Sequence, residues 1–347
     1  MDTVTQVALG AAVGEAVMGR RVGRRAAAWG GLCGLLPDLD LLVPLTDAVE
    51  RLTWHRGPSH SLFVLAAATP LMVRLILKLH PSSADHRGRW ARLVFLAFAT
   101  HVLLDCFTVY GTQILWPLPT PPVMWSTLFI IDPAYSIPLL AGVLAAIFLY
   151  RSPRGYRLNA LGLALSSLYL LWSVGAKIHV ESAVRASLAR QGVPYTALLT
   201  SPTAFNTLLW RVVAVDDSGY AEGYYSILDG RRDVRVVHHP ANRALLSGLE
   251  GHRPVQRLQW FSHGFYAVDR EGGGIVVTDL RMGMEPDYTF RFRVAAEAEP
   301  HPIPEPARRI RSARDFRALA WIWQRIWSDR LHPDARDGLQ VSHRESS

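Results

Sequence analysis

Cysteine is scarce in this sequence: only Cys33 and Cys106 occur in a chain of 347 residues, and both lie within apolar segments. This number excludes a disulfide framework and any CxxC zinc motif. Residues 1–3 carry no basic cluster ahead of an apolar run, so no cleavable signal peptide is expected. Charge is also sparse, at 19% of residues, while 50% are hydrophobic. That balance is unusual for a soluble globular protein.

Positive charge is present but scattered. The formal net charge is +8, and many basic residues stand in short clusters at 20–25, 86–92 and 151–157, between apolar segments. Nucleic-acid binding needs the positive charges on one surface, whereas membrane segments carry short basic flanks. We therefore expect the lipid bilayer as a partner and no nucleic acid, and the sequence leaves the identity of any protein partner unknown.

The N-terminal half consists mainly of long apolar runs. Residues 158–176 contain no charge and are long enough to span a bilayer. The other runs are shorter or interrupted, and they occupy residues 4–36 (two short helices), 61–79, 91–110 and 134–150. The sequence predicts an α-helical membrane domain of about four to six helices over residues 1–183.

The basic clusters also predict an orientation. If the apolar runs cross in pairs, all three clusters lie on one side of the membrane, and the positive-inside rule makes that side cytoplasmic. The segments 37–60 and 111–132 then lie on the outer side, and the last helix delivers the C-terminal domain there too. We expect a multi-pass protein of a bacterial inner membrane with a periplasmic C-terminal domain.

The pattern changes near residue 184. Runs rich in Val, Tyr, Phe and Trp, such as GIVVTDL, YTFRFRV and LQWFSHGFYAVDR, alternate with Gly- and Asp-rich turns. Residues 184–300 are therefore predicted to form a soluble, mainly β domain with an antiparallel meander. Residues 301–347 are expected to hold a Pro- and Arg-rich linker, an amphipathic helix near 313–331 and a disordered tail.

Three stretches of the apolar half concentrate residue types that bind metals. His101 and Asp105 stand four residues apart on a predicted helix, so their side chains share one face. In an apolar helix a His and an Asp are costly unless they pair or coordinate a cation. A buried hydrogen bond between the two without any metal is the alternative.

The other two stretches lie in predicted loops. In HRGPSHS, His55 and His60 flank a Gly-Pro break, Ser59 can cap the helix that follows, and Arg56 suits an anionic group. In PDLD, Asp38 and Asp40 follow a helix end and have no basic neighbour. A surface loop and a solvated helix end, respectively, are the alternatives.

Together these residues predict a site for a divalent metal. Asp and His ligands suit zinc best, with manganese or iron as alternatives, and the expected topology brings all three stretches to one membrane face. The predicted ligands are Asp38, Asp40, His55, His60, His101 and Asp105. Asp38, Arg56 and Asp105 are the predicted catalytic groups, and Gln6, Arg56 and Gln113 are predicted to contact substrate. A metal-activated water would attack an ester or phosphoester.

The motifs GLLPDLD, HRGPSHSL and HVLLDCFTVYGTQILWP resemble the YdjM-like family of predicted inner-membrane metal-dependent hydrolases, over roughly residues 1–180. The resemblance implies a helical inner-membrane protein that uses the same Asp and His residues. The segment WFSHGFYAV resembles a β extension found in one branch of the family. The HxxxD helix is also distantly similar to that of zinc-dependent phospholipase C, which is an analogy of fold alone.

Two other functions stay open from the sequence. The metal could join helices in a non-enzymatic membrane protein whose β domain binds a partner or an envelope polymer. A metal or ion transporter is the third reading, but it would need charged residues along a continuous path, whereas here they gather near one face. A closed coordination sphere would favour a structural role, and an open position would favour catalysis.

Overall fold

The structure is a computed structural model that describes residues 1–230, 233–311 and 317–328. The chain divides into two compact units. The first comprises residues 1–45 and 51–173, and the second comprises residues 46–50 and the chain from residue 174 onward. The boundary falls inside a long helix.

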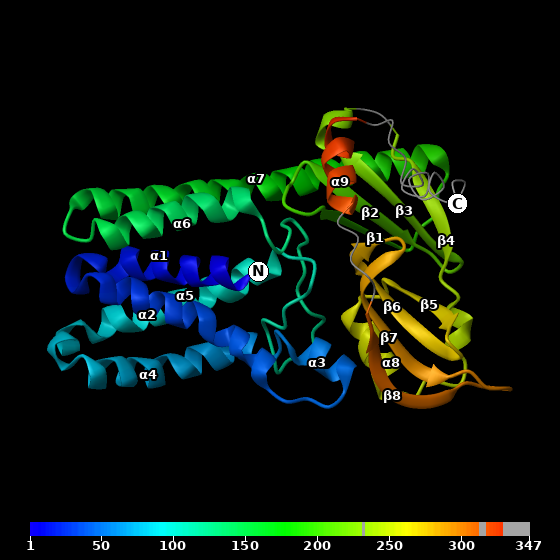
Figure 1. Cartoon of the computed structure of the whole chain (residues 1–347), viewed down its shortest axis with the longest axis horizontal. Helices are drawn as coiled ribbons and strands as arrows, with labels where there is room; N and C mark the ends of the chain where they lie inside the picture. The colour runs from blue at the N-terminus through cyan, green and yellow to red at the C-terminus, as the bar shows by residue number, and fades with distance from the viewer. Residues whose placement is uncertain (231–232, 312–316, 329–347) are drawn as a thin grey trace, which may run out of the picture. The chain divides into compact units, whose positions relative to one another are not determined.

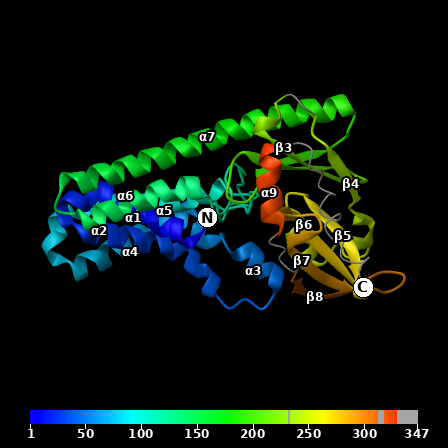
Figure 2. The ribbon, with the colours of Figure 1, turned by 45° about the horizontal axis from the view of Figure 1, so that its top comes forward.

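The first unit is built from helical hairpins (Figures 1 and 2). Within the described residues its long helices are α1 (Thr3–Val22), α2 (Arg24–Leu35), α4 (Leu62–Leu79), α5 (Arg87–Cys106), α6 (Pro133–Phe148) and the first part of α7 (Pro153–Gln191). Helix α1 contacts α2, α5 and α6, and α4 contacts α5. A short helix α3 (Ala48–Trp54) and the 3-10 turns η1 (Leu36–Leu42), η2 (Pro58–His60) and η3 (Pro81–His86) connect them.

Side chains at the helix starts explain why these helices begin where they do. Asp2 accepts a hydrogen bond from the backbone N–H of Thr5, Ser61 caps α4, and Asp132 caps α6. Each cap satisfies a backbone donor that has no partner inside its own helix. The expectation that Ser59 caps α4 is wrong, because the cap lies two residues later and Ser59 has another partner.

The two ends of the helical unit differ in charge. The turns α1–α2, α4–α5 and α6–α7 lie at one end (Figure 1) and coincide with the three basic clusters. The connections 36–61 and 107–132 lie at the opposite end. The sequence-based expectation that the basic clusters share one end is therefore met by the helix order.

Two helices of the described chain are long and apolar enough to cross a membrane, by length and composition. They are α4 and α7. In each, 22% of the most apolar 18-residue segment is buried inside the protein. Helix α6 is apolar but shorter. Helix α5 is not one of the two, and it carries Arg87, Arg89 and Arg92 in its first turns and Asp105 near its end. The structure thus supports fewer spans than the four to six helices expected.

The second unit contains two four-stranded antiparallel sheets, each with its strands in sequence order. One sheet holds β1 (Ala197–Pro202), β2 (Leu209–Val215), β3 (Gly219–Ser226) and β4 (Val236–Pro240). The other holds β5 (Tyr266–Glu271), β6 (Gly274–Met284), β7 (Asp287–Ala296) and β8 (Ile303–Ile310). This unit also contains the C-terminal part of α7, the 3-10 turns η4 (Ile227–Asp229) and η5 (Arg243–Leu246), and helices α8 (Arg253–Phe261) and α9 (Arg317–Trp327). The sequence predicted one antiparallel meander, and the structure contains two, one in each sheet.

Two local expectations in this unit are wrong. Part of the expected linker forms β8, which pairs with β7 along Arg291↔Ile310 to Ala296↔Ile303. Its prolines are tolerated because β8 is an edge strand, where missing N–H donors leave no neighbour unpaired. The run LQWFSHGFYAVDR begins inside helix α8, and strand β5 starts only at Tyr266. The expected tail beyond residue 328 lies outside the described residues.

A buried ion pair joins the two sheets. Arg211 on β2 donates to Glu222 on β3 at 2.5 Å and to the main-chain carbonyl of Leu280 on β6 at 2.6 Å. The hydroxyl of Tyr288 on β7 donates to the same Glu222 oxygen at 2.9 Å. A buried ion pair needs such additional hydrogen bonds to be stable. The bonds with Leu280 and Tyr288 connect this pair to the second sheet.

Candidate metal centre

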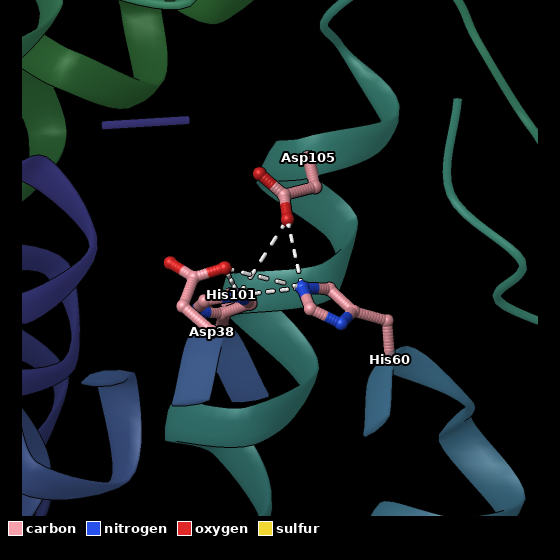
Figure 3. Close-up of side chains that lie close together, drawn as sticks. All are labelled: Asp38, His60, His101 and Asp105. Atoms are coloured by element: carbon pink, nitrogen blue, oxygen red, sulfur yellow. Dashed lines mark hydrogen bonds and ion pairs between the residues drawn. The ribbon is translucent and has the colours of Figure 1, made fainter. Parts of the chain in front are cut away.

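Four acidic and imidazole side chains converge in the helical unit. Asp38, His60, His101 and Asp105 each offer one ligand atom, and these atoms all lie within 4.8 Å of one another. Figure 3 shows the two imidazoles and the two carboxylates turned toward a common point. All four residues were predicted as ligands from the sequence.

Different elements carry these side chains. Asp38 lies in η1, directly after α2, and His60 ends η2 just before α4. His101 and Asp105 lie one turn apart near the end of α5. The helical spacing places the latter two on one face, and the proline-containing turns bring the former two to the same end of the unit.

The facing atoms of these four side chains lie close to one another. His60 Nε2 lies 3.2 Å from His101 Nε2, 3.4 Å from Asp38 Oδ1 and 3.3 Å from Asp105 Oδ2. His101 Nε2 lies 3.6 Å and 3.5 Å from the same two carboxylate oxygens. Each atom thus faces all the others around one small volume.

The outer nitrogens of both rings have acceptors, which defines the tautomers. His101 Nδ1 lies 2.7 Å from the carbonyl oxygen of Gly34, so it must donate there. His60 Nδ1 lies 2.9 Å from Ser59 Oγ, whose own hydrogen goes to Asp40 at 2.5 Å. In the neutral rings both Nε2 atoms therefore present lone pairs to each other and to two carboxylates. A cation between them removes that repulsion, and imidazoles oriented in this way are typical metal ligands.

Asp105 is divided between two environments. Its Oδ1 accepts from Gln6 Nε2 at 3.0 Å, from Arg56 Nη2 at 3.0 Å and from the α-amino group of Met1. Its Oδ2 is buried and has no hydrogen-bond partner among the described residues. A buried carboxylate oxygen without a partner is costly. Because this oxygen points at the two Nε2 atoms, the donor set fits a divalent cation.

Asp38 is the most accessible of the four. Its side chain is 10% exposed, whereas those of the other three are at most 1% exposed. Asp38 therefore lies on the side from which a ligand could enter.

Two other predicted ligands lie in a second layer. Asp40 accepts from Ser59 Oγ, from the backbone N–H of Arg56 at 3.1 Å and pairs with His55 Nδ1 at 2.8 Å. The structure does not bring Asp40 or His55 into the group of four. They hold the loop 55–60 in place, and through Ser59 they orient the His60 ring.

The three polar residues predicted to contact substrate have structural partners. Gln6 donates to Asp105 and to the backbone oxygen of His101 at 3.2 Å. The buried Arg56 contacts Asp105 and Thr108 through its two Nη atoms, while its Nε has no partner among the described residues. The side chain of Gln113 donates to the backbone oxygen of Thr53 at 2.6 Å.

Sequence reasoning missed the role of Ser59 and the α-amino contact of Met1. Ser59 was available as a signal, because a hydroxyl directly before a candidate ligand can orient its ring. The contact of Met1 with Asp105 joins groups 104 residues apart, and no local pattern predicts it.

The comparisons agree with the motifs. The family model described as YdjM inner membrane protein matches residues 1–180, which is more than half of the chain and contains all four converging residues. An uncharacterized protein of Bacillus subtilis strain 168, YfhP, is 29% identical over 248 residues, covering 68% of this chain and 73% of the relative. No solved structure gives a significant match. The chain therefore belongs to the YdjM family of inner membrane proteins.

Proposed function

We propose that this protein is a membrane-bound, metal-dependent hydrolase. Its divalent cation would be held by Asp38, His60, His101 and Asp105, and its substrate would be an ester or phosphoester. One observation carries the proposal: one nitrogen of each of two imidazoles and one oxygen of each of two carboxylates lie within 4.8 Å of one another, and the buried oxygen of Asp105 has no hydrogen-bond partner among the described residues. Zinc, manganese and iron all suit this donor set.

A divalent cation bound there would lower the pKa of a water molecule and polarise a carbonyl or phosphoryl oxygen. The chain's own residues supply the rest. Asp38 lies on the accessible side, and its Oδ1 faces the two imidazoles, so its second carboxylate oxygen would take a proton from water as a general base. Arg56 pairs with Asp105, and its Nε, which has no partner among the described residues, would donate to a developing anion.

A non-enzymatic role is the second candidate, and one observation favours it. Four protein ligands with little exposure complete a tetrahedral zinc sphere, which is typical of a structural site. Such a site would join η1, η2 and α5. An octahedral ion such as manganese would leave positions for water and substrate, so the two roles differ in which metal is bound and in what it does.

Turnover by purified protein separates these roles. Protein in detergent would be loaded with zinc or manganese and assayed with short p-nitrophenyl esters and bis-p-nitrophenyl phosphate. We expect turnover that disappears on chelation and in Asp38→Asn, and that persists in Asp85→Asn, an exposed carboxylate of η3. If metal-replete protein hydrolyses none of these substrates and chelation only lowers the unfolding temperature, the structural role is correct.

A further inference from the structure

An apolar groove runs along α4 beside the metal centre. It has a volume of about 380 Å³, which lies within the range of small-molecule sites. Leu65 and Phe98, both buried, form its floor, while Leu71 and Leu75 lie on its exposed rim. Ser59 is the one polar residue among those that line it.

One end of the groove reaches the metal centre. Pro37, which lines the groove, directly precedes Asp38, and Ser59 directly precedes His60 and lies 2.9 Å from its ring. One end of the groove therefore lies next to the residues that carry two of the ligands, Asp38 and His60. The only hydroxyl of its lining stands at that end, where a polar group of a ligand would lie.

The other end follows α4 away from the centre. Lining residues on this helix extend from Val64 to Leu75, a helical rise of about 16 Å. Helix α4 is one of the two candidate membrane spans among the described residues, and most of the helix is not buried inside the protein. The rim residues Leu71 and Leu75 are 63% and 45% exposed, so a bilayer would bring hydrocarbon to the open side of the groove.

We propose that the substrate is a glycerophospholipid-like amphiphile whose acyl chain lies in this groove with its hydrolysable group at the metal centre. The inference rests on the proposed hydrolase function and specifies its substrate class. A long apolar groove that ends at a polar, charged centre is complementary to a molecule with one hydrocarbon chain and a polar head. A small water-soluble substrate would leave this groove without an occupant.

The test places a bulky side chain in the groove and compares it with a matched neighbour. Ala68 lines the groove, whereas Ala67 is exposed and does not. Ala68→Trp fills the groove, and Ala67→Trp adds the same volume on the outer face of α4. Leu71→Gln, at the exposed rim, is a second variant in case Ala68→Trp does not fold. The metal content of each variant reports whether the centre is intact.

The probe is phosphatidylglycerol with a photoreactive diazirine in its acyl chain, incorporated in nanodiscs with each protein. Adducts are mapped by mass spectrometry. We expect adducts on the buried floor residues Leu65 and Phe98. These adducts should fall at least tenfold in Ala68→Trp, fall in Leu71→Gln, and persist in Ala67→Trp. Adducts confined to exposed residues such as Phe63, or unchanged in Ala68→Trp, would overturn the inference.

Hydrolysis assays of the same variants keep the two proposals distinguishable. If short esters are hydrolysed equally by the wild type and Ala68→Trp, and floor adducts are absent, the groove proposal fails while the hydrolase function stands. If floor adducts form but neither phospholipid nor short ester is hydrolysed, the hydrolase function fails, and with it the assignment of this lipid as substrate. Support requires floor adducts together with phospholipid hydrolysis that Ala68→Trp abolishes and Ala67→Trp retains.

Discussion

The ligands of the centre depend on a chain of hydrogen bonds behind them. Asp40 accepts from Ser59, and Ser59 accepts from His60, so three neighbouring residues hold one imidazole lone pair toward the metal. Asp38, His60, His101 and Asp105 could be predicted from motif order and residue type alone. Which acidic residue binds and which only supports could not, because PDLD offers two equivalent carboxylates and only the loop geometry separates them.

Ser59→Ala tests this chain. Without the hydroxyl, the His60 ring loses the acceptor that defines its tautomer, and removal of such supporting groups typically lowers metal affinity by about 10- to 100-fold. Zinc affinity would be measured by competition with a chelating dye. Ser82→Ala, at an exposed position of η3, is the control and should bind zinc as the wild type does. Equal affinity in all three proteins would show that Ser59 does not orient His60.

The Arg211–Glu222 pair gives the β unit a pH-dependent stability. Burial alone would raise the pKa of the Glu222 carboxyl, but the charge of Arg211 and hydrogen bonds from Arg211, Tyr224 and Tyr288 lower it. A carboxyl with a lowered folded-state pKa stabilises the fold above its unfolded value, about 4.3, and this contribution is lost as the pH falls further.

Glu222→Gln removes that dependence. The neutral amide leaves Arg211 buried without a counter-charge, so we expect a loss of about 3–5 kcal/mol at pH 7. The loss relative to wild type should shrink as the pH falls below about 4.3. Thermal unfolding followed by the β-sheet infrared band would measure it. A difference between the two proteins that stays constant from pH 7 to pH 3 would contradict this role.

At the scale of elements, close contact between α1 and α2 positions the centre. A Cβ on Gly30 would lie 2.1 Å from the carbonyl oxygen of Gly10, so the two helices touch through their backbones. Helix α2 carries Gly34, whose carbonyl accepts from His101, and leads into Asp38. The small residues of this hairpin were visible in the sequence, and the apolar runs predicted the helices well.

Gly30→Ala should therefore weaken both the fold and the metal site. Overpacking at this contact is expected to cost about 1–3 kcal/mol and to displace α2 and Asp38. Gly88→Ala is the matched control, because a Cβ there meets nothing within 4 Å, and it should stabilise α5 by up to about 1 kcal/mol. Unfolding temperature and zinc affinity would be measured for both. If Gly30→Ala matched Gly88→Ala in unfolding temperature and zinc affinity, the close contact between α1 and α2 would not be needed for the fold or the metal site.

The elements that the sequence did not predict are decided by tertiary contacts. Strand β8 contains Pro304 and Pro306, which are typical of a linker, and it forms a strand because it pairs with the edge of β7. Helix α8 has one apolar face, with Val255, Leu258 and Phe261 buried, but its aromatic residues also suit a strand. In both segments the local composition suits more than one kind of secondary structure, and the contacts with the rest of the unit determine which one forms.

For the whole molecule, the helix order gives the unit a basic end and a metal-binding end. We propose that the basic end faces the cytoplasm and that the β unit is periplasmic, in accordance with the positive-inside rule. The family places the chain in an inner membrane. The two native cysteines are buried, so a single introduced thiol would report its own side of the membrane.

Labelling with a membrane-impermeant maleimide tests this orientation. We expect Ser218→Cys, at an exposed turn between β2 and β3, to be labelled in intact spheroplasts. Ser82→Cys, at the basic end, should be labelled only after lysis. The unmodified protein is the control for its buried Cys33 and Cys106. The reverse pattern would place the β unit in the cytoplasm and reject the proposed topology.

The central claim is that a divalent metal is bound by two imidazoles and two carboxylates, and elemental analysis combined with X-ray absorption tests it most directly. Detergent-purified protein should hold about one equivalent of metal, with two imidazole nitrogens and at least two oxygens in the first coordination sphere at about 2.0–2.2 Å if the metal is zinc. His101→Ala should lose the metal, and His80→Ala, which contacts Trp29, should keep it. Wild-type protein that holds no metal after reloading, or that binds metal as well when His101 is replaced, would contradict the account.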